Sequence, residues 1–173
     1  DMLGSKRTGL YTKKPNSSAY DPRAMVFEVD TSITGLINGQ PLSENTFRIP
    51  LAPTPAGKQT SILIDWGDGN TEMFTRQGGN VTLPEHTYSQ TGTYNVSFAP
   101  LKGSPDDYFG IKCSISEMAD YKKRITKVLD WGADNNPSVL EFKGCVKMYV
   151  TATNTPDLSN LQSLEEMFSG CTS

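Results

Sequence analysis

A strand pattern followed by a tight turn lies between residues 61 and 75, where the sequence reads SILIDWGDGNTEMFT. The apolar run before Trp66 indicates a largely buried strand. The four residues that follow, 67–70, are Gly-Asp-Gly-Asn, and an Asp-Gly pair adopts positive φ angles at low cost. Residues 71–75 alternate in the manner of a return strand. The sequence therefore predicts a β-hairpin that turns at 67–70.

Further strand candidates lie on both sides of this hairpin and are separated by turns rich in glycine and proline. They cover residues 25–29, 46–51, 94–98 and 108–115. Short strands with frequent turn signals are typical of two antiparallel sheets packed face to face. We therefore expect an all-β protein built around an antiparallel β-sandwich.

The composition excludes several classes of function. The chain has 173 residues and a net charge of −3, which argues against a general nucleic-acid binder. No apolar run approaches the roughly 20 residues of a helical membrane span, so we expect no membrane span. His86 is the only histidine, and neither glycine-rich phosphate-binding motif occurs. We therefore expect a protein that is not an enzyme and binds no cofactor and no metal.

Residues 1–24 differ from the rest because they carry a local charge of +3, which leaves −6 for the remainder. They have few large apolar side chains and no strand or helix period, so they cannot fold alone. We predict an extended assembly arm held by neighbouring subunits of a symmetric oligomer; the alternative is an arm packed on its own domain. The expected contact residues are basic or aromatic: Lys6, Arg7, Tyr11, Lys13, Lys14, Tyr20 and Arg23.

A weak internal repeat appears after a connector at residues 102–124. The octamer SVLEFKGC at 138–145 resembles LEEMFSGC at 164–171, with the two Phe-x-Gly-Cys groups 26 residues apart. A period in the twenties is typical of solenoids, in which each coil covers the apolar face of the next. We expect free thiols and a last coil that is covered by further chain or by a partner. The predicted repeat core consists of Phe142, Cys145, Phe168 and Cys171.

Two regions resemble known families. The motifs IDWGDG at 64–69, HTY at 86–88 and GTYNV at 92–96 together resemble a PKD domain, which is an immunoglobulin-like sandwich; the resemblance covers about residues 25–101. The motifs TNTPDLSN at 153–160 and EMFSGCTS at 166–173 resemble BspA-type leucine-rich repeats of bacterial surface proteins. Both kinds of unit recur in surface and phage proteins. The resemblance therefore implies display and adhesion rather than a reaction.

The residues of the first motif have expected structural roles. Trp66 should anchor the core, and Asp65 and Asp68 should accept hydrogen bonds from the amides of the turn. His86 should be a hydrogen-bonded partner of the hairpin, and the hydroxyl of Tyr94 should bond back to the connecting loop. Calcium at the two carboxylates is the alternative, although their spacing does not fit an EF-hand and calcium needs about six to eight oxygen ligands. The complete motif is Asp65, Trp66, Asp68, His86, Tyr88 and Tyr94.

These observations divide the chain into an arm (1–24), a sandwich (25–101), a connector (102–124) and a repeat segment (125–173). We expect a phage virion component, such as a tail, neck or head-decoration appendage, whose arm docks on other virion subunits. Its repeats would face outward toward a host receptor or glycan. The first residues lack the apolar region of a secretory signal. The alternatives are a secreted bacterial surface adhesin with its signal removed, and a calcium-dependent carbohydrate-binding module.

Overall fold

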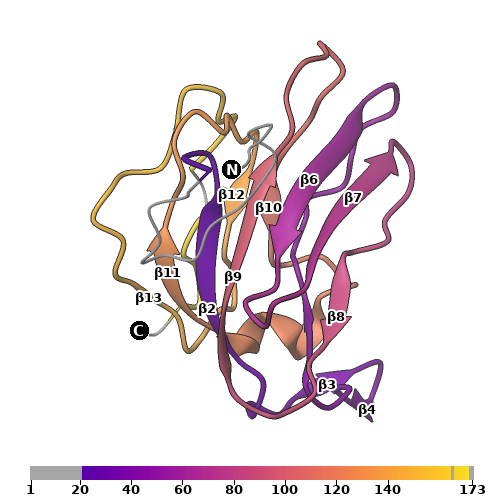
Figure 1. The fold of residues 1–173 in the computed structure, drawn as a ribbon, viewed down its shortest axis with the longest axis vertical. Helices are drawn as coiled ribbons and strands as arrows, with labels where there is room; N and C mark the ends of the chain where they lie inside the picture. The colour runs from indigo at the N-terminus through magenta and orange to yellow at the C-terminus, as the bar shows by residue number, and fades with distance from the viewer. Residues whose placement is uncertain (1–20, 165, 172–173) are drawn as a thin grey trace.

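The computed structural model describes residues 21–164 and 166–171, and this part of the chain is all-β (Figure 1). Its single helix is the short 3-10 helix η1 (Ala119–Arg124). No helix in the described ranges is long and apolar enough to cross a membrane.

The largest sheet of the described residues has six strands, in the order β13-β11-β2-β9-β6-β7. β11 and β13 are parallel, whereas every other neighbouring pair is antiparallel. The predicted hairpin is present as β6 and β7, which pair from Gln59 and Gln77 down to Asp65 and Thr71. The strands of this sheet are β2 (Met25–Asp30), β6 (Gln59–Asp65), β7 (Thr71–Gln77), β9 (Thr93–Pro100), β11 (Ile125–Asp130) and β13 (Tyr149–Val150).

Three two-stranded pairs make up the remaining sheets. The strand expected at 46–51 is reduced to β5, and farther along Leu51 forms only an isolated bridge with Ile111. The strand expected at 108–115 is likewise reduced to β10. The pairs are β3 (Leu36–Ile37) with β4 (Gln40–Pro41), β5 (Thr46–Arg48) with β8 (Glu85–Thr87), and β10 (Ile111–Lys112) with β12 (Leu140–Glu141).

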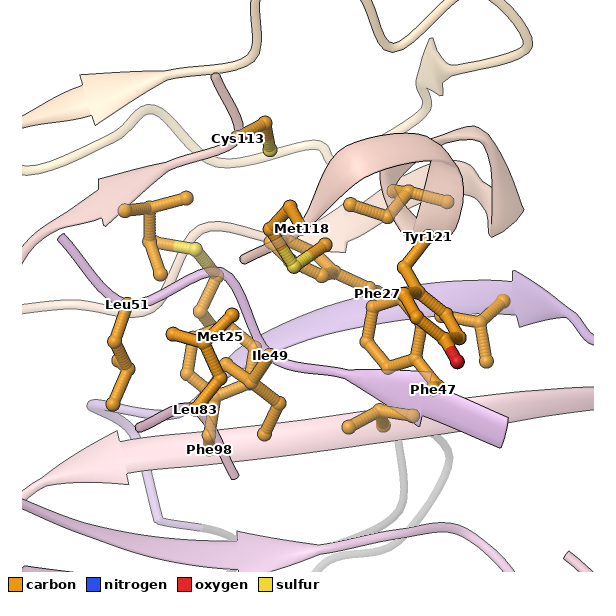
Figure 2. Packing of buried hydrophobic residues seen from close by; sticks show 14 of the residues in the cluster. Met25, Phe27, Phe47, Ile49, Leu51, Leu83, Phe98, Cys113, Met118 and Tyr121 are labelled. Atoms are coloured by element: carbon orange, nitrogen blue, oxygen red, sulfur yellow. The ribbon is translucent and has the colours of Figure 1, made fainter. Parts of the chain in front are cut away.

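Apolar side chains from the six-stranded sheet and from the shorter strand pairs meet in one cluster. Phe27 on β2 lies edge-on to Phe98 on β9, with ring centroids 5.1 Å apart. Phe47 and Ile49, from β5 and the segment after it, pack against these rings and are fully buried (Figure 2). Removing one such side chain from water contributes about 1.5–3 kcal/mol, so this cluster is a main source of stability.

The region expected to be a connector contributes much of the same core. Its buried residues belong to the cluster that begins at Met25 and continues to Met148. Arg124, at the end of η1, is buried as well, and its guanidinium donates to the carbonyl of Thr46 on β5. The core is therefore continuous across the expected boundaries at 101 and 124. The buried connector residues are Phe109, Ile111, Cys113, Met118 and Tyr121.

The last residues of the expected arm pack on the body of the protein. The amide of Ala133 donates to the carbonyl of Pro22 (2.7 Å), and the side chain of Asn135 donates to the carbonyl of Arg23 (3.1 Å). Ala24 is fully buried. Of the predicted arm residues, only Arg23 falls within the described ranges. The others, Lys6, Arg7, Tyr11, Lys13, Lys14 and Tyr20, lie outside the described residues.

Candidate functional site

The turn at the end of β6 is held by its own carboxylates. Asp65 Oδ1 accepts a hydrogen bond from the amide of Gly67 (2.9 Å), and Asp68 Oδ1 accepts one from the amide of Asn70 (3.0 Å). These are the bonds that the sequence predicted. Gly67 has a φ of +87°, and a Cβ there would lie 2.4 Å from the carbonyl oxygen of Asn95. The turn therefore requires glycine at this position.

His86 lies directly beside the turn. Its Nε2 is 2.7 Å from Asp68 Oδ2, and its ring stacks on Trp66 with centroids 5.0 Å apart. The indole nitrogen of Trp66 donates to Glu72 on β7 (2.9 Å). Burial acts to raise the pKa of Asp68, but the hydrogen bonds from His86 and Asn70 outweigh it and lower that pKa below its usual value. The imidazole is thus part of a brace that joins the turn to β8.

Two tyrosines complete this brace. The hydroxyl of Tyr88 donates to the carbonyl of Trp66 (2.6 Å), and burial raises the pKa of Tyr88, so the phenol remains a neutral donor. The hydroxyl of Tyr94 donates to the carbonyl of Gln90 (2.7 Å), which is the predicted bond back to the connecting loop. The two rings stack with centroids 3.8 Å apart. The motif residues therefore satisfy one another and hold the turn in place.

Few side chains near this turn are available as metal ligands. Both carboxylates of the turn accept hydrogen bonds from protein groups. Across residues 21–164 and 166–171, no three His, Cys, Asp or Glu side chains are grouped so that they could hold a metal ion.

The C-terminal part of the chain lies as parallel segments one beside the next. The amide of Ile111 donates to the carbonyl of Val139 (2.8 Å), and the amide of Phe142 donates to the carbonyl of Met167 (2.7 Å). Farther along, the amide of Gly144 donates to the carbonyl of Ser169 (2.9 Å). Backbone segments near residues 111, 140 and 168 therefore follow one another in a stack, which we call the C-terminal stack.

The predicted repeat core lies in this stack but is not enclosed equally. Phe142 is fully buried, and its ring stacks on Phe168 with centroids 6.0 Å apart. Phe168 itself is 43% exposed, so it lies at the open end of the stack. Cys145 is a buried free thiol, and the thiol of Cys171 donates to the carbonyl of Phe142.

The buried thiol of Cys113 is not activated for chemistry. Burial, together with the neighbouring Cys145, raises the pKa of the Cys113 thiol well above its usual value. Because the thiolate is the reactive form, a raised pKa makes a thiol inert.

Several large apolar side chains are exposed along the C-terminal residues 149–168. The large apolar side chains exposed there are more than half of those exposed in the whole described chain. Exposed apolar side chains of this size are available for contact with a partner. We call this set of side chains the apolar end; it consists of Tyr149, Val150, Leu158, Leu164 and Phe168.

A pocket that sequence reasoning missed lies where the C-terminal stack meets the loop after β9. Its volume is about 250 Å³. The lining includes Lys102 and Tyr108 from that loop, Asn135 and Asn136 from the segment before β12, and Asn160 from the segment after β13. These are single polar residues in loops without a recurrent spacing. No sequence signal could therefore have brought them together.

Comparison of the chain with protein families, curated proteins and solved structures found no match.

Proposed function

We propose that this protein is a non-enzymatic display protein. An immunoglobulin-like sandwich of PKD type, at residues 25–101, acts as a rigid spacer. The first coils of a BspA-like solenoid, at residues 125–173, present a binding surface. What supports this reading is the continuous core from Met25 to Met148, which fixes the C-terminal stack rigidly to the six-stranded sheet.

The observation that carries the proposal is the apolar end of the stack. Tyr149 and Leu164 are each 58% exposed, although they belong to the same segments that pack inward through Met148 and Met167. A surface of this kind favours binding of a partner over a reaction. The residues of the brace around His86 are occupied with one another, which favours a structural role for them.

The more specific proposal is a phage virion component, such as a tail, neck or head-decoration appendage. Its arm docks on other virion subunits, and its repeats face a host receptor or glycan. The charge of the chain supports this division, because the first 24 residues carry +3 whereas the whole chain carries −3. The second candidate is a secreted bacterial surface adhesin, which the BspA-like motifs favour equally.

Deletion of residues 1–20 tests the docking role. The deletion spares Pro22, Arg23 and Ala24, which pack against the body, so the truncated chain should keep its melting temperature. We expect this chain to be missing from purified virions. A full-length chain with Lys58→Gln, a surface change outside the arm, serves as the control and should be incorporated normally. Incorporation of the truncated chain at the normal level would overturn the docking role.

A further inference from the structure

The pocket between the loop after β9 and the C-terminal stack contains an unusual buried amide. Asn135 is fully buried, and its Nδ2 donates to the carbonyls of Trp131 (2.9 Å) and Arg23 (3.1 Å). Its Oδ1 has no hydrogen-bond partner. Buried acceptors without a partner are rare in folded proteins, because their desolvation is not compensated. The lining of the pocket therefore includes a buried polar atom that forms no hydrogen bond within the described chain.

Other polar groups in the lining of the pocket form fewer hydrogen bonds than they could. Within the described ranges, no hydrogen bond is formed by the hydroxyl of Tyr108 or the ammonium of Lys102. Asn160 uses its Nδ2 on the hydroxyl of Ser138 (2.9 Å), which leaves its Oδ1 as an acceptor. Burial raises the pKa of Tyr108, so its phenol stays protonated and can donate. The pocket thus offers both donors and acceptors to a ligand.

The charge around the pocket argues against an anionic ligand. Burial lowers the pKa of Lys102, and the positive charge of Arg23 acts in the same direction, while the carboxylates of Asp157, Asp134 and Asp107 raise it. Three carboxylates and one guanidinium therefore act on the one lysine in the lining, and this excess of negative charge disfavours phosphate or sulfate. A neutral ligand is the better match.

The remaining lining is apolar. Pro100, Leu101 and Phe109 form part of the wall. A ligand must therefore combine hydroxyl groups on its edge, which act as donors and acceptors at once, with an apolar face of C–H groups. A pyranose ring has both properties. The volume of about 250 Å³ lies just below the range of drug-sized pockets and fits one such ring.

We propose that this pocket binds a single neutral pyranose unit of a surface glycan. This inference rests on the proposed display function and gives its glycan contact a definite place, at the root of the stack rather than at the apolar end. Tyr108 and Asn160 contact the hydroxyl edge of the sugar in this pocket.

The test is a titration of the full chain with glucose, galactose, mannose and N-acetylglucosamine, followed by amide chemical shifts in NMR. At least one sugar should cause saturable shifts confined to residues 101–109, 135–138 and 160. Tyr108→Phe and Asn160→Ala should each weaken that binding roughly five- to tenfold, since each removes one hydrogen bond. The matched controls, Tyr149→Phe at the apolar end and Asn95→Ala on β9, should leave it unchanged.

Several outcomes would overturn the proposal. One is that none of the four sugars shifts the amides of the pocket; another is that the shifts lie at the apolar end. Equal shifts with sodium sulfate would identify an anion site instead and would also refute it. The sugar titration and the arm deletion give independent results. If no sugar binds the pocket but residues 1–20 are needed for incorporation, only the sugar site is refuted. If a sugar binds the pocket but the chain is incorporated without residues 1–20, only the docking role is refuted.

Discussion

The turn after β6 and the C-terminal stack use their side chains in opposite ways. At the turn, Trp66, Asp68, His86 and Tyr88 direct their polar atoms and ring faces toward one another. In the stack, Phe168 lies 43% exposed, and the neighbouring pocket contains polar groups without partners. A region whose groups are mutually satisfied supports the fold, whereas a region with unused groups is available for binding. The contrast predicts different responses to mutation.

The largest difference should appear when one aromatic side chain is removed from each region. Trp66→Ala deletes a side chain that is 1% exposed, and we expect the free energy of unfolding to fall by about 3–5 kcal/mol. Phe168→Ala removes a side chain at the open end and should cost only about 1 kcal/mol. Urea denaturation of both variants measures the two values. Equal losses would remove the distinction between a supporting and a binding region.

A smaller effect is expected inside the turn, where two glycines provide a matched pair. Gly67→Ala brings a Cβ to 2.4 Å from the carbonyl oxygen of Asn95, at a φ of +87°. Gly69→Ala has a similar φ of +95° but no atom within 4 Å. Gly69→Ala should therefore cost only the backbone strain, about 1–2 kcal/mol, and Gly67→Ala should cost about 1–2 kcal/mol more.

Thermal or urea unfolding of both glycine variants checks this prediction. If the two variants lose the same stability, the close approach between the turn and β9 contributes nothing, and the brace depends on its side chains alone.

The same contrast explains what could be predicted from the sequence. Three features depend on residues that are close in the chain: the hairpin, its capping carboxylates and the bond from Tyr94 to Gln90. The residue types at these positions therefore predict the features directly. The pairing of β11 with β2 depends on contacts between distant residues, such as the bond from Thr126 to Glu28. Thr126 falls in the expected repeat segment at 125–173, and nothing in the local pattern indicates its partner strand.

The candidate pocket could not be predicted for a related reason. Lys102, Asn135 and Asn160 belong to three different loops, and they come together only because the stack folds beside the end of β9. Polar residues in loops are common, and their meaning depends on which neighbours remain without hydrogen bonds. That information exists only in the folded chain.

The smallest expected effect concerns the pH dependence of the brace. The pKa of Asp68 is lower in the folded protein than its usual value, so the unfolded chain binds more protons at acidic pH. The stabilisation from Asp68 is therefore complete above its unfolded pKa of about 3.9 and is lost as the pH falls through the lower folded value. Asp68→Asn should remove this component and flatten the stability profile below about pH 5.

Urea denaturation of Asp68→Asn at a series of acidic pH values measures that profile. Asp106→Asn is the matched control, because this exposed carboxylate forms no side-chain hydrogen bond or ion pair within the described ranges, and its profile should follow that of the unmodified chain. A profile of Asp68→Asn that is as steep as that of the control would mean that the contact with His86 does not stabilise the ionised carboxylate. The turn would then be held by its backbone and aromatic packing, and the brace would resemble the C-terminal stack more than the contrast between them implies.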